Sequence, residues 1–254
     1  MYVHYERQGS GPILLLLHGI GSNSRAFRHQ LTELSDAWTV VAWDAPGYGR
    51  SDDPSEPFTL ADLADQALAL LDELEAEQAH VLGVSMGGVI AQLMYHRHPL
   101  RVRSLILADT NMGGGGLPEP ERAARVQGRL DALKQLGPRG MAEARAPVLL
   151  RPDAPADLRA EVTEIMAEVR PAGYRAAAIA LGQTDLTSLL GAIAVPTLVV
   201  HGAQDRVVPV ETGRMLANSI AGARLVVIPE AGHVANQEQP ELFNAAVRQF
   251  LADG

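Results

Sequence analysis

The chain has 254 residues, 47% of them hydrophobic and 20% charged, which is an ordinary composition for a globular protein able to bury a large core. Its net charge of −9 argues against nucleic acid and anionic membranes as partners. It contains no cysteine, which excludes disulfides, thiolate metal sites and a cysteine nucleophile. The first residues lack the pattern of a secretory signal, and the apolar run 13–17 is too short to span a bilayer. We therefore expect a cytoplasmic protein with no membrane partner.

Short apolar runs alternate with amphipathic segments along most of the chain. The runs predict strands over 13–17, 40–43, 81–84, 102–108, 197–200 and 225–228, and a weak alternation over 2–7 predicts an edge strand. Helical spacing predicts helices that start near 24, at 60 with Thr59 as N-cap, at 86, near 209 and near 240. Strands and helices that alternate in this way form right-handed βαβ units. The sequence thus predicts an α/β fold with a mostly parallel sheet flanked by helices.

The segment 111–190 interrupts this alternation. It is rich in alanine, arginine and proline, has helical but no strand periodicity, and contains ten basic and ten acidic residues, so the rest of the chain carries the net charge. Its prolines predict several short helices, divided at 138, 147, 152, 155 and 171. An insertion after a strand lies over the carboxyl edge of the sheet. We expect a core of 1–110 and 191–254 and a helical cap, or lid, of 111–190.

A G-x-S-x-G pentapeptide, Gly83 to Gly87, lies between the predicted strand 81–84 and an apolar helix. At a strand-to-helix turn this motif forces its serine into a strained conformation and exposes the hydroxyl at the sheet edge. The glycines allow the strand and the helix to pass closely. Ser85 is therefore the candidate nucleophile, with the N–H of Met86 beside it at the start of a helix.

A serine hydroxyl needs a general base, and the base needs an acid that orients it. Asp205 follows the predicted strand 197–200, and His233 follows the last predicted strand. The order Ser85, Asp205, His233 is the one expected for this architecture. Asp109 also ends a strand and is a second candidate for the acid, although we favour Asp205.

The sequence His18-Gly19-Ile20-Gly21 follows the buried run 13–17. Small residues at this place allow a backbone N–H to approach a substrate carbonyl oxygen, so we expect an oxyanion hole formed by the N–H groups of Ile20 and Met86. His96 and His98 do not share a helix face and have no carboxylate cluster beside them, so we expect no metal site there.

These pieces together resemble the α/β-hydrolase superfamily over the chain outside 111–190. The matching pieces are His18-Gly19, 44–51, 83–88, 196–205 and Gly232-His233. The resemblance implies the α/β-hydrolase fold, with a helical cap inserted after the sixth strand in the superfamily's numbering. Epoxide hydrolases and haloalkane dehalogenases have an aspartate where this chain has Ser85.

Within the superfamily, segments 102–110 and 233–240 are similar to 3-oxoadipate enol-lactonases and carboxylesterases. Those lactonases tend to have an Arg-Trp pair in the cap. This cap has no tryptophan, and Arg151 is the candidate for the arginine position. Ring-cleavage carbon–carbon hydrolases usually have a tryptophan after the catalytic histidine, where this chain has Val234.

We therefore predict a serine hydrolase of a small carboxylic ester or lactone, which needs no cofactor or metal. Its partner is the small-molecule substrate, and the sequence leaves the oligomeric state open. The alternatives are a carbon–carbon bond hydrolase, a cofactor-free perhydrolase, and a hydrolase-like receptor that binds a small ligand without useful turnover.

Overall fold

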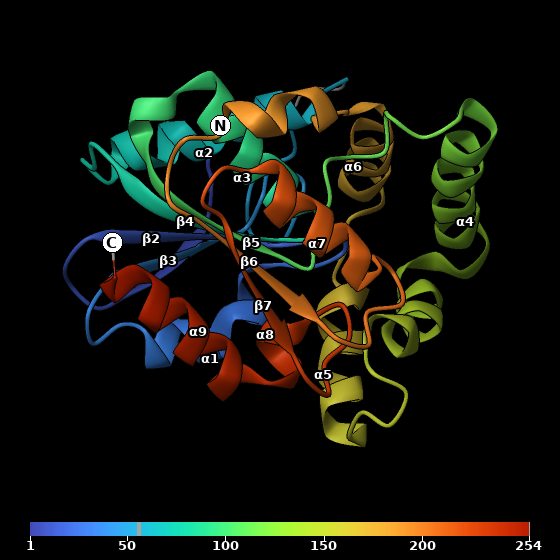
Figure 1. The fold of residues 1–254 in the computed structure, drawn as a ribbon. Helices are drawn as coiled ribbons and strands as arrows, with labels where there is room; N and C mark the ends of the chain where they lie inside the picture. Colours follow the sequence, from blue (N-terminus) through green and yellow to red (C-terminus); the bar gives the residue numbers. More distant parts are fainter. Residues whose placement is uncertain (55–56, 254) are drawn as a thin grey trace.

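The computed structural model describes residues 1–54 and 57–253. In this part of the chain, seven strands form one sheet in the order β1-β3-β2-β4-β5-β6-β7 (Figure 1). β1 pairs antiparallel with β3, and the other neighbours are parallel, as predicted. The strands are β1 (Tyr5–Gln8), β2 (Ile13–Leu17), β3 (Thr39–Trp43), β4 (Ala79–Val84), β5 (Val102–Ala108), β6 (Thr197–Gly202) and β7 (Arg224–Ile228).

Helices cover both faces of the sheet. The α-helices are α1 (Arg28–Glu33), α2 (Leu60–Glu73), α3 (Met86–Arg97), α4 (Glu119–Leu149), α5 (Ala156–Ala167), α6 (Pro171–Gln183), α7 (Val210–Ser219), α8 (Ala235–Glu238) and α9 (Pro240–Ala252). Short 3₁₀ helices span Ser24–Phe27, Pro99–Arg101 and Thr187–Ala192. None of the helices in the described residues has both the length and the apolar composition needed to cross a bilayer.

Side chains alternate across the central strands and divide the core into two layers. In β2, Leu15 and Leu17 belong to the core layer that contains residues of α2, α3 and α7, whereas Leu14 and Leu16 belong to the layer that contains residues of α1 and α9. The two groups of helices lie on opposite faces of the sheet in Figure 1. Such two-sided burial explains why the strands are continuous apolar runs. Thr59 caps α2 as predicted, through a reciprocal pair of hydrogen bonds with Asp62.

The chain between β5 and β6 contains α4, α5 and α6, which lie together beside the sheet (Figure 1). The prediction of a helix break at each proline was wrong at Pro147, which lies inside α4. Pro147 is exposed, so water can bind the carbonyl that loses its helical partner. The break predicted at Pro138 is present: Gly137, directly before it, has a φ of 66° and a ψ of 177°, which divide α4 into two arms. We propose that 111–190 is a cap on a core formed by 1–110 and 191–254.

The turn from β4 into α3 has the strained geometry that the pentapeptide predicts. Ser85 has a φ of 54° and a ψ of −117°, which is unusual for a residue with a side chain. Gly83 and Gly87 allow the chain to pass closely, because a Cβ on Gly83 would lie 2.2 Å from the Gly87 carbonyl oxygen. A Cβ on Gly87 would lie 1.9 Å from the carbonyl oxygen of Leu17 in β2.

We expect Gly87→Ala to destabilise the protein, because its new methyl group would overlap the backbone of a central strand. Overpacking a core costs about 1–3 kcal/mol, so the urea midpoint should fall. Gly128→Ala is the matched control: it lies on an exposed part of α4, and nothing lies within 4 Å of an added Cβ. That change should stabilise the protein by about 1 kcal/mol. A Gly87→Ala protein as stable as the wild type would contradict this packing.

A buried histidine in β4 makes stability depend on pH. His80 lies 2.7 Å from the hydroxyl of Ser104 through Nδ1. Burial, with a smaller contribution from the positive charge of Arg103, lowers the pKa of His80 to about 4. The unfolded chain, with an ordinary pKa near 6.5, binds this proton more readily than the folded chain does. Stability should therefore fall as the pH falls from about 6.5 towards 4.

Urea denaturation of the wild type, His80→Asn and His98→Asn at pH 7.5 and 5.0 tests this. His98 is exposed and serves as the control. The loss of stability between the two pH values should be smaller in His80→Asn than in the other two proteins. Equal losses in all three would show that His80 is not responsible.

Candidate active site

Ser85 follows the last residue of β4 and is half-buried at the carboxyl edge of the sheet. Its N–H donates to the carbonyl oxygen of Ala108 at 2.9 Å, and its own carbonyl accepts from the Thr110 hydroxyl at 2.6 Å. These bonds fix the backbone on both sides of the side chain. The hydroxyl Oγ lies 2.9 Å from Nε2 of His233.

The three residues predicted to act together are in hydrogen-bond contact. Nδ1 of His233 lies 2.8 Å from Oδ2 of Asp205, so one imidazole connects the aspartate to Ser85. The other carboxylate oxygen of Asp205 accepts from the N–H groups of Val207 and Val208 at 2.7 and 2.9 Å. Burial by itself raises the pKa of the Asp205 carboxyl, but hydrogen bonds from His201 and His233 outweigh it and hold that pKa well below its usual range. Asp205 is therefore ionised.

Asp109, the second candidate for the acid, is completely buried nearby but does not bond the His233 ring. Its two oxygens accept from the N–H of Gly202 at 2.8 Å and from the N–H of Ala235 at 3.0 Å. Burial raises the pKa of Asp109. Asp109 therefore connects the end of β6 to the segment after His233 through two hydrogen bonds.

His201 is a member of this cluster that the sequence analysis did not single out. It is fully buried, and its Nε2 lies 2.8 Å from the carbonyl oxygen of Val208 and 3.4 Å from Oδ2 of Asp205. Burial alone lowers the pKa of His201, but the neighbouring carboxylates of Asp205 and Asp109 raise it above the ordinary value. The only sequence signal was a histidine inside an otherwise apolar strand.

Asp109, His201 and Asp205 have potential ligand atoms within 4.8 Å of one another. A metal would need free lone pairs on these atoms. Both carboxylates already accept backbone hydrogen bonds, and the His201 Nε2 faces the Val208 carbonyl. The donor set therefore fits an internal hydrogen-bond network better than a metal site.

The loop after β2 is held in a fixed orientation by His18. Nε2 of His18 accepts from the N–H of Ala45 at 3.0 Å, so Nδ1 bears the proton and donates to the carbonyl oxygen of Gly19 at 2.9 Å. Burial lowers the pKa of His18, which keeps the ring neutral. Because a trans peptide places its C=O and N–H on opposite sides, this bond also orients the N–H of Ile20. Neither this N–H nor that of Met86 donates to another residue among those described.

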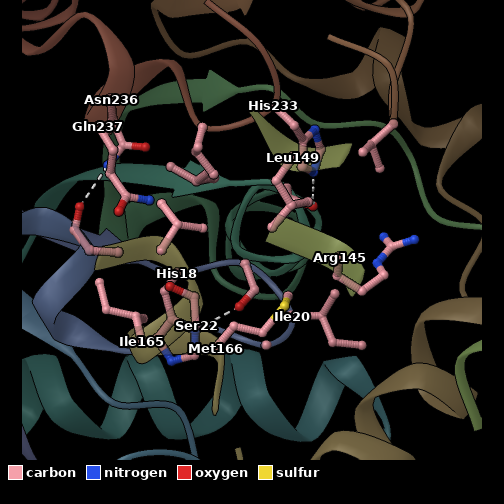
Figure 2. Close-up of a pocket in the computed structure, with 18 of the residues that line it drawn as sticks. His18, Ile20, Ser22, Arg145, Leu149, Ile165, Met166, His233, Asn236 and Gln237 are labelled. Carbon is pink, nitrogen blue, oxygen red and sulfur yellow. Dashed lines mark hydrogen bonds between the residues drawn. The ribbon is translucent and has the colours of Figure 1, made fainter. Parts of the chain in front are cut away.

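The end of α4 is bonded directly to the His233 loop. The N–H of His233 donates to the carbonyl oxygen of Leu149 at 2.7 Å, as Figure 2 shows. Glu238 accepts from Gly232 N–H at 2.6 Å and from Arg151 N–H at 2.9 Å. The side chain of Arg151, the candidate for the lactonase arginine, pairs instead with Asp153 and the Glu230 carbonyl.

A cavity that is partly open to solvent is lined by Ser85 and His233. Figure 2 shows it with His233 among the labelled residues. The loop after β2 and the His233 loop line one side of the cavity, and α4, α5 and α6 line the other. The lining is largely apolar and includes Phe27, Leu149, Val162, Ile165 and Met166.

Known proteins resemble the chain over almost its whole length. It is 31% identical over 248 residues to 3-oxoadipate enol-lactonase 2 of Acinetobacter baylyi, covering 96% of this chain and 90% of the relative. It is 30% identical over 255 residues to the pimeloyl-[acyl-carrier protein] methyl ester esterase of Chromobacterium violaceum, with 99% and 98% covered.

Among solved structures, a thermophilic esterase from Thermogutta terrifontis superposes with a TM-score of 0.91 and 30% identity, covering 99% of this chain and 93% of the esterase. Residues 12–240 match the family described as the alpha/beta hydrolase fold. With the sheet order and the turn at Ser85, these matches identify the chain as a member of the α/β-hydrolase family.

Proposed function

We propose that this protein is a serine hydrolase that cleaves a small carboxylic ester or lactone through an acyl-enzyme on Ser85. The observation that carries the proposal is the continuous hydrogen-bond chain from Asp205 through His233 to Ser85, at the base of a largely apolar cavity. The similarity to an enol-lactonase and to a methyl ester esterase supports the same reaction class.

In the first step, Ser85 Oγ attacks the substrate carbonyl carbon while His233 Nε2 takes the hydroxyl proton. The 2.9 Å separation of these two atoms suits the transfer. Asp205 holds the Nδ1–H of the imidazole and stabilises the imidazolium that forms. Its two bonds from Val207 and Val208 hold the carboxylate in place.

The negative charge that develops on the substrate oxygen needs donors that are already oriented. We assign this role to the N–H groups of Ile20 and Met86, which have no acceptor within the described part of the protein. The His18 bond to Gly19 orients the first, and the start of α3 orients the second. Each donor of this kind typically contributes about 2.7–4 kcal/mol to transition-state stabilisation.

The tetrahedral intermediate collapses when His233 returns its proton to the leaving alkoxide oxygen, which leaves an ester on Ser85. His233 then takes a proton from water, and the resulting attack releases the acid and restores the serine hydroxyl. In these steps, side chains and backbone N–H groups of the chain itself supply the nucleophile, transfer the protons and bind the oxyanion.

We expect Ser85→Ala to lose ester hydrolysis by about four orders of magnitude or more, because no nucleophile remains. The measurement is hydrolysis of p-nitrophenyl esters from acetate to octanoate, with urea denaturation as a check of folding. The chain-length dependence of the wild type reports the size of the acyl pocket. A folded Ser85→Ala protein with wild-type turnover would refute the acyl-enzyme mechanism.

A second prediction separates the two buried aspartates. Asp205→Asn should lower kcat by about 10⁴-fold with little change in KM, because an amide no longer favours the required imidazole tautomer. Asp109→Asn should mainly lower the urea midpoint, since the amide can no longer accept both backbone hydrogen bonds. If Asp109→Asn lost kcat as severely as Asp205→Asn in a folded protein, Asp109 would have to act in the chemistry.

A further inference from the structure

Two arginines lie where the cavity over Ser85 meets the outside. Arg129 lies on the first arm of α4 and Arg145 on the second, on either side of the interruption at Gly137. Both line the cavity and also an outer hollow whose lining includes Arg125 and Arg206. Figure 2 shows Arg145 on the opposite side of the cavity from Asn236 and Gln237. The two guanidinium groups therefore stand at the junction of the two spaces.

Neither guanidinium group has a hydrogen bond or an ion pair within residues 1–54 and 57–253, and Nε of Arg145 is fully shielded from solvent. Several other arginines of the 111–190 segment are paired. These pairs are Arg122 with Glu119, Arg125 with Glu121, Arg139 with Glu164, Arg151 with Asp153 and Arg170 with Asp53. Arg129 and Arg145, by contrast, line the cavity with no such pair in the described part of the chain.

An unpaired, desolvated cation is unfavourable unless an anion joins it. Burial lowers the pKa of Arg129, and the positive charge of Arg145 acts in the same direction. The two cations thus lie close enough to repel each other. An anion bound between them would relieve both the desolvation and the repulsion.

Tyr174 adds a neutral donor at the same place. It lines both the cavity and the outer hollow with Arg129 and Arg145. Burial raises the pKa of Tyr174, so its hydroxyl keeps its proton and can donate to an anion. Two guanidinium forks and a phenol hydroxyl form a donor set suited to a carboxylate.

We propose that Arg129, Arg145 and Tyr174 form a carboxylate subsite, and that the substrates are esters or lactones with a carboxylate remote from the scissile carbonyl. The inference rests on the proposed function of Ser85. The apolar lining between the two ends, which includes Ile165 and Met166, holds the hydrocarbon part of the substrate. Arg151 takes no part, because its side chain bonds Asp153 and Glu230 elsewhere.

The test compares esters that differ only in the carboxylate. Methyl butanoate to methyl octanoate are paired with the monomethyl esters of the dicarboxylic acids of the same chain length. Acetate esters of ω-hydroxy acids, paired with acetates of simple alcohols, place the carboxylate on the leaving group. For at least one chain length, the wild type should give a higher kcat/KM with the charged ester, and added salt should reduce this preference.

Arg145→Gln and Arg129→Gln should each lower the ratio of charged to neutral kcat/KM by about 10-fold to 100-fold. Arg125→Gln is the matched control: Arg125 lines the outer hollow but not the cavity, and it is paired with Glu121. Its ratio should stay at the wild-type value. Urea denaturation of each variant checks that it is folded.

The possible outcomes separate the two proposals. Hydrolysis of neutral esters with no charged preference in either series would overturn the carboxylate subsite and leave the serine hydrolase standing. An equal drop in the ratio for Arg125→Gln would also overturn it, because diffuse positive charge would then be sufficient. If the folded wild type hydrolysed no ester of either kind, the proposed function itself would fail.

If the glutamine variants do not fold, inhibition of the wild type by carboxylic acids still tests the subsite. Glutarate should inhibit hydrolysis of p-nitrophenyl acetate competitively and at lower concentration than butanoate, and added salt should weaken this difference. Equal inhibition by the two acids would overturn the subsite.

Discussion

The close approach of backbone at the turn between β4 and α3 is the constraint on which the candidate site depends. α3 can start directly after β4 only because Gly83 and Gly87 have no side chains. A Cβ on Gly83 would overlap the backbone of Gly87, and a Cβ on Gly87 would overlap the backbone of Leu17. The turn in turn requires Ser85 to adopt a left-handed φ, which lifts its hydroxyl off the sheet edge. The apolar packing of β4 and α3 in the core offsets the free-energy cost of this strain.

The other residues reach Ser85 because buried carboxylates connect loops that are far apart in the sequence. Asp109 joins the end of β6 to Ala235, Asp205 joins its own loop to His233, and Glu238 joins Gly232 to Arg151. Each accepts backbone N–H groups that would otherwise be buried without a partner. Several bonds thus fix the position of His233, which suits its proposed role as a general base within hydrogen-bond distance of Ser85.

The same bonds connect the insertion to the chemistry. Leu149 at the end of α4 accepts the N–H of His233, so the wall of the cavity and the proposed base form one unit. The interruption at Gly137 folds α4 into two arms, and this brings Arg129 and Arg145 to one place although sixteen positions separate them. In the proposed function, the core carries out the ester hydrolysis and the insertion supplies the groups that distinguish between substrates.

The sequence by itself determined the fold, because strand and helix periodicities, glycine spacing and the order of Ser85, Asp205 and His233 are all local signals that one architecture satisfies. It also predicted an oxyanion hole formed by the N–H groups of Ile20 and Met86, and this assignment stays a prediction. Only the tertiary structure decided between Asp205 and Asp109 as the partner of His233, because both follow strands at the same edge of the sheet. The carboxylate of Asp205 faces the His233 ring, whereas that of Asp109 faces the backbone N–H of Ala235. The sequence could not distinguish the arginines of the insertion, because no local pattern separates one from another. These arginines are Arg122, Arg125, Arg129, Arg145 and Arg151. Which of them meets a carboxylate from its own chain, and which two face the cavity unpaired, depends on how α4 bends and packs, and no local pattern encodes that contact.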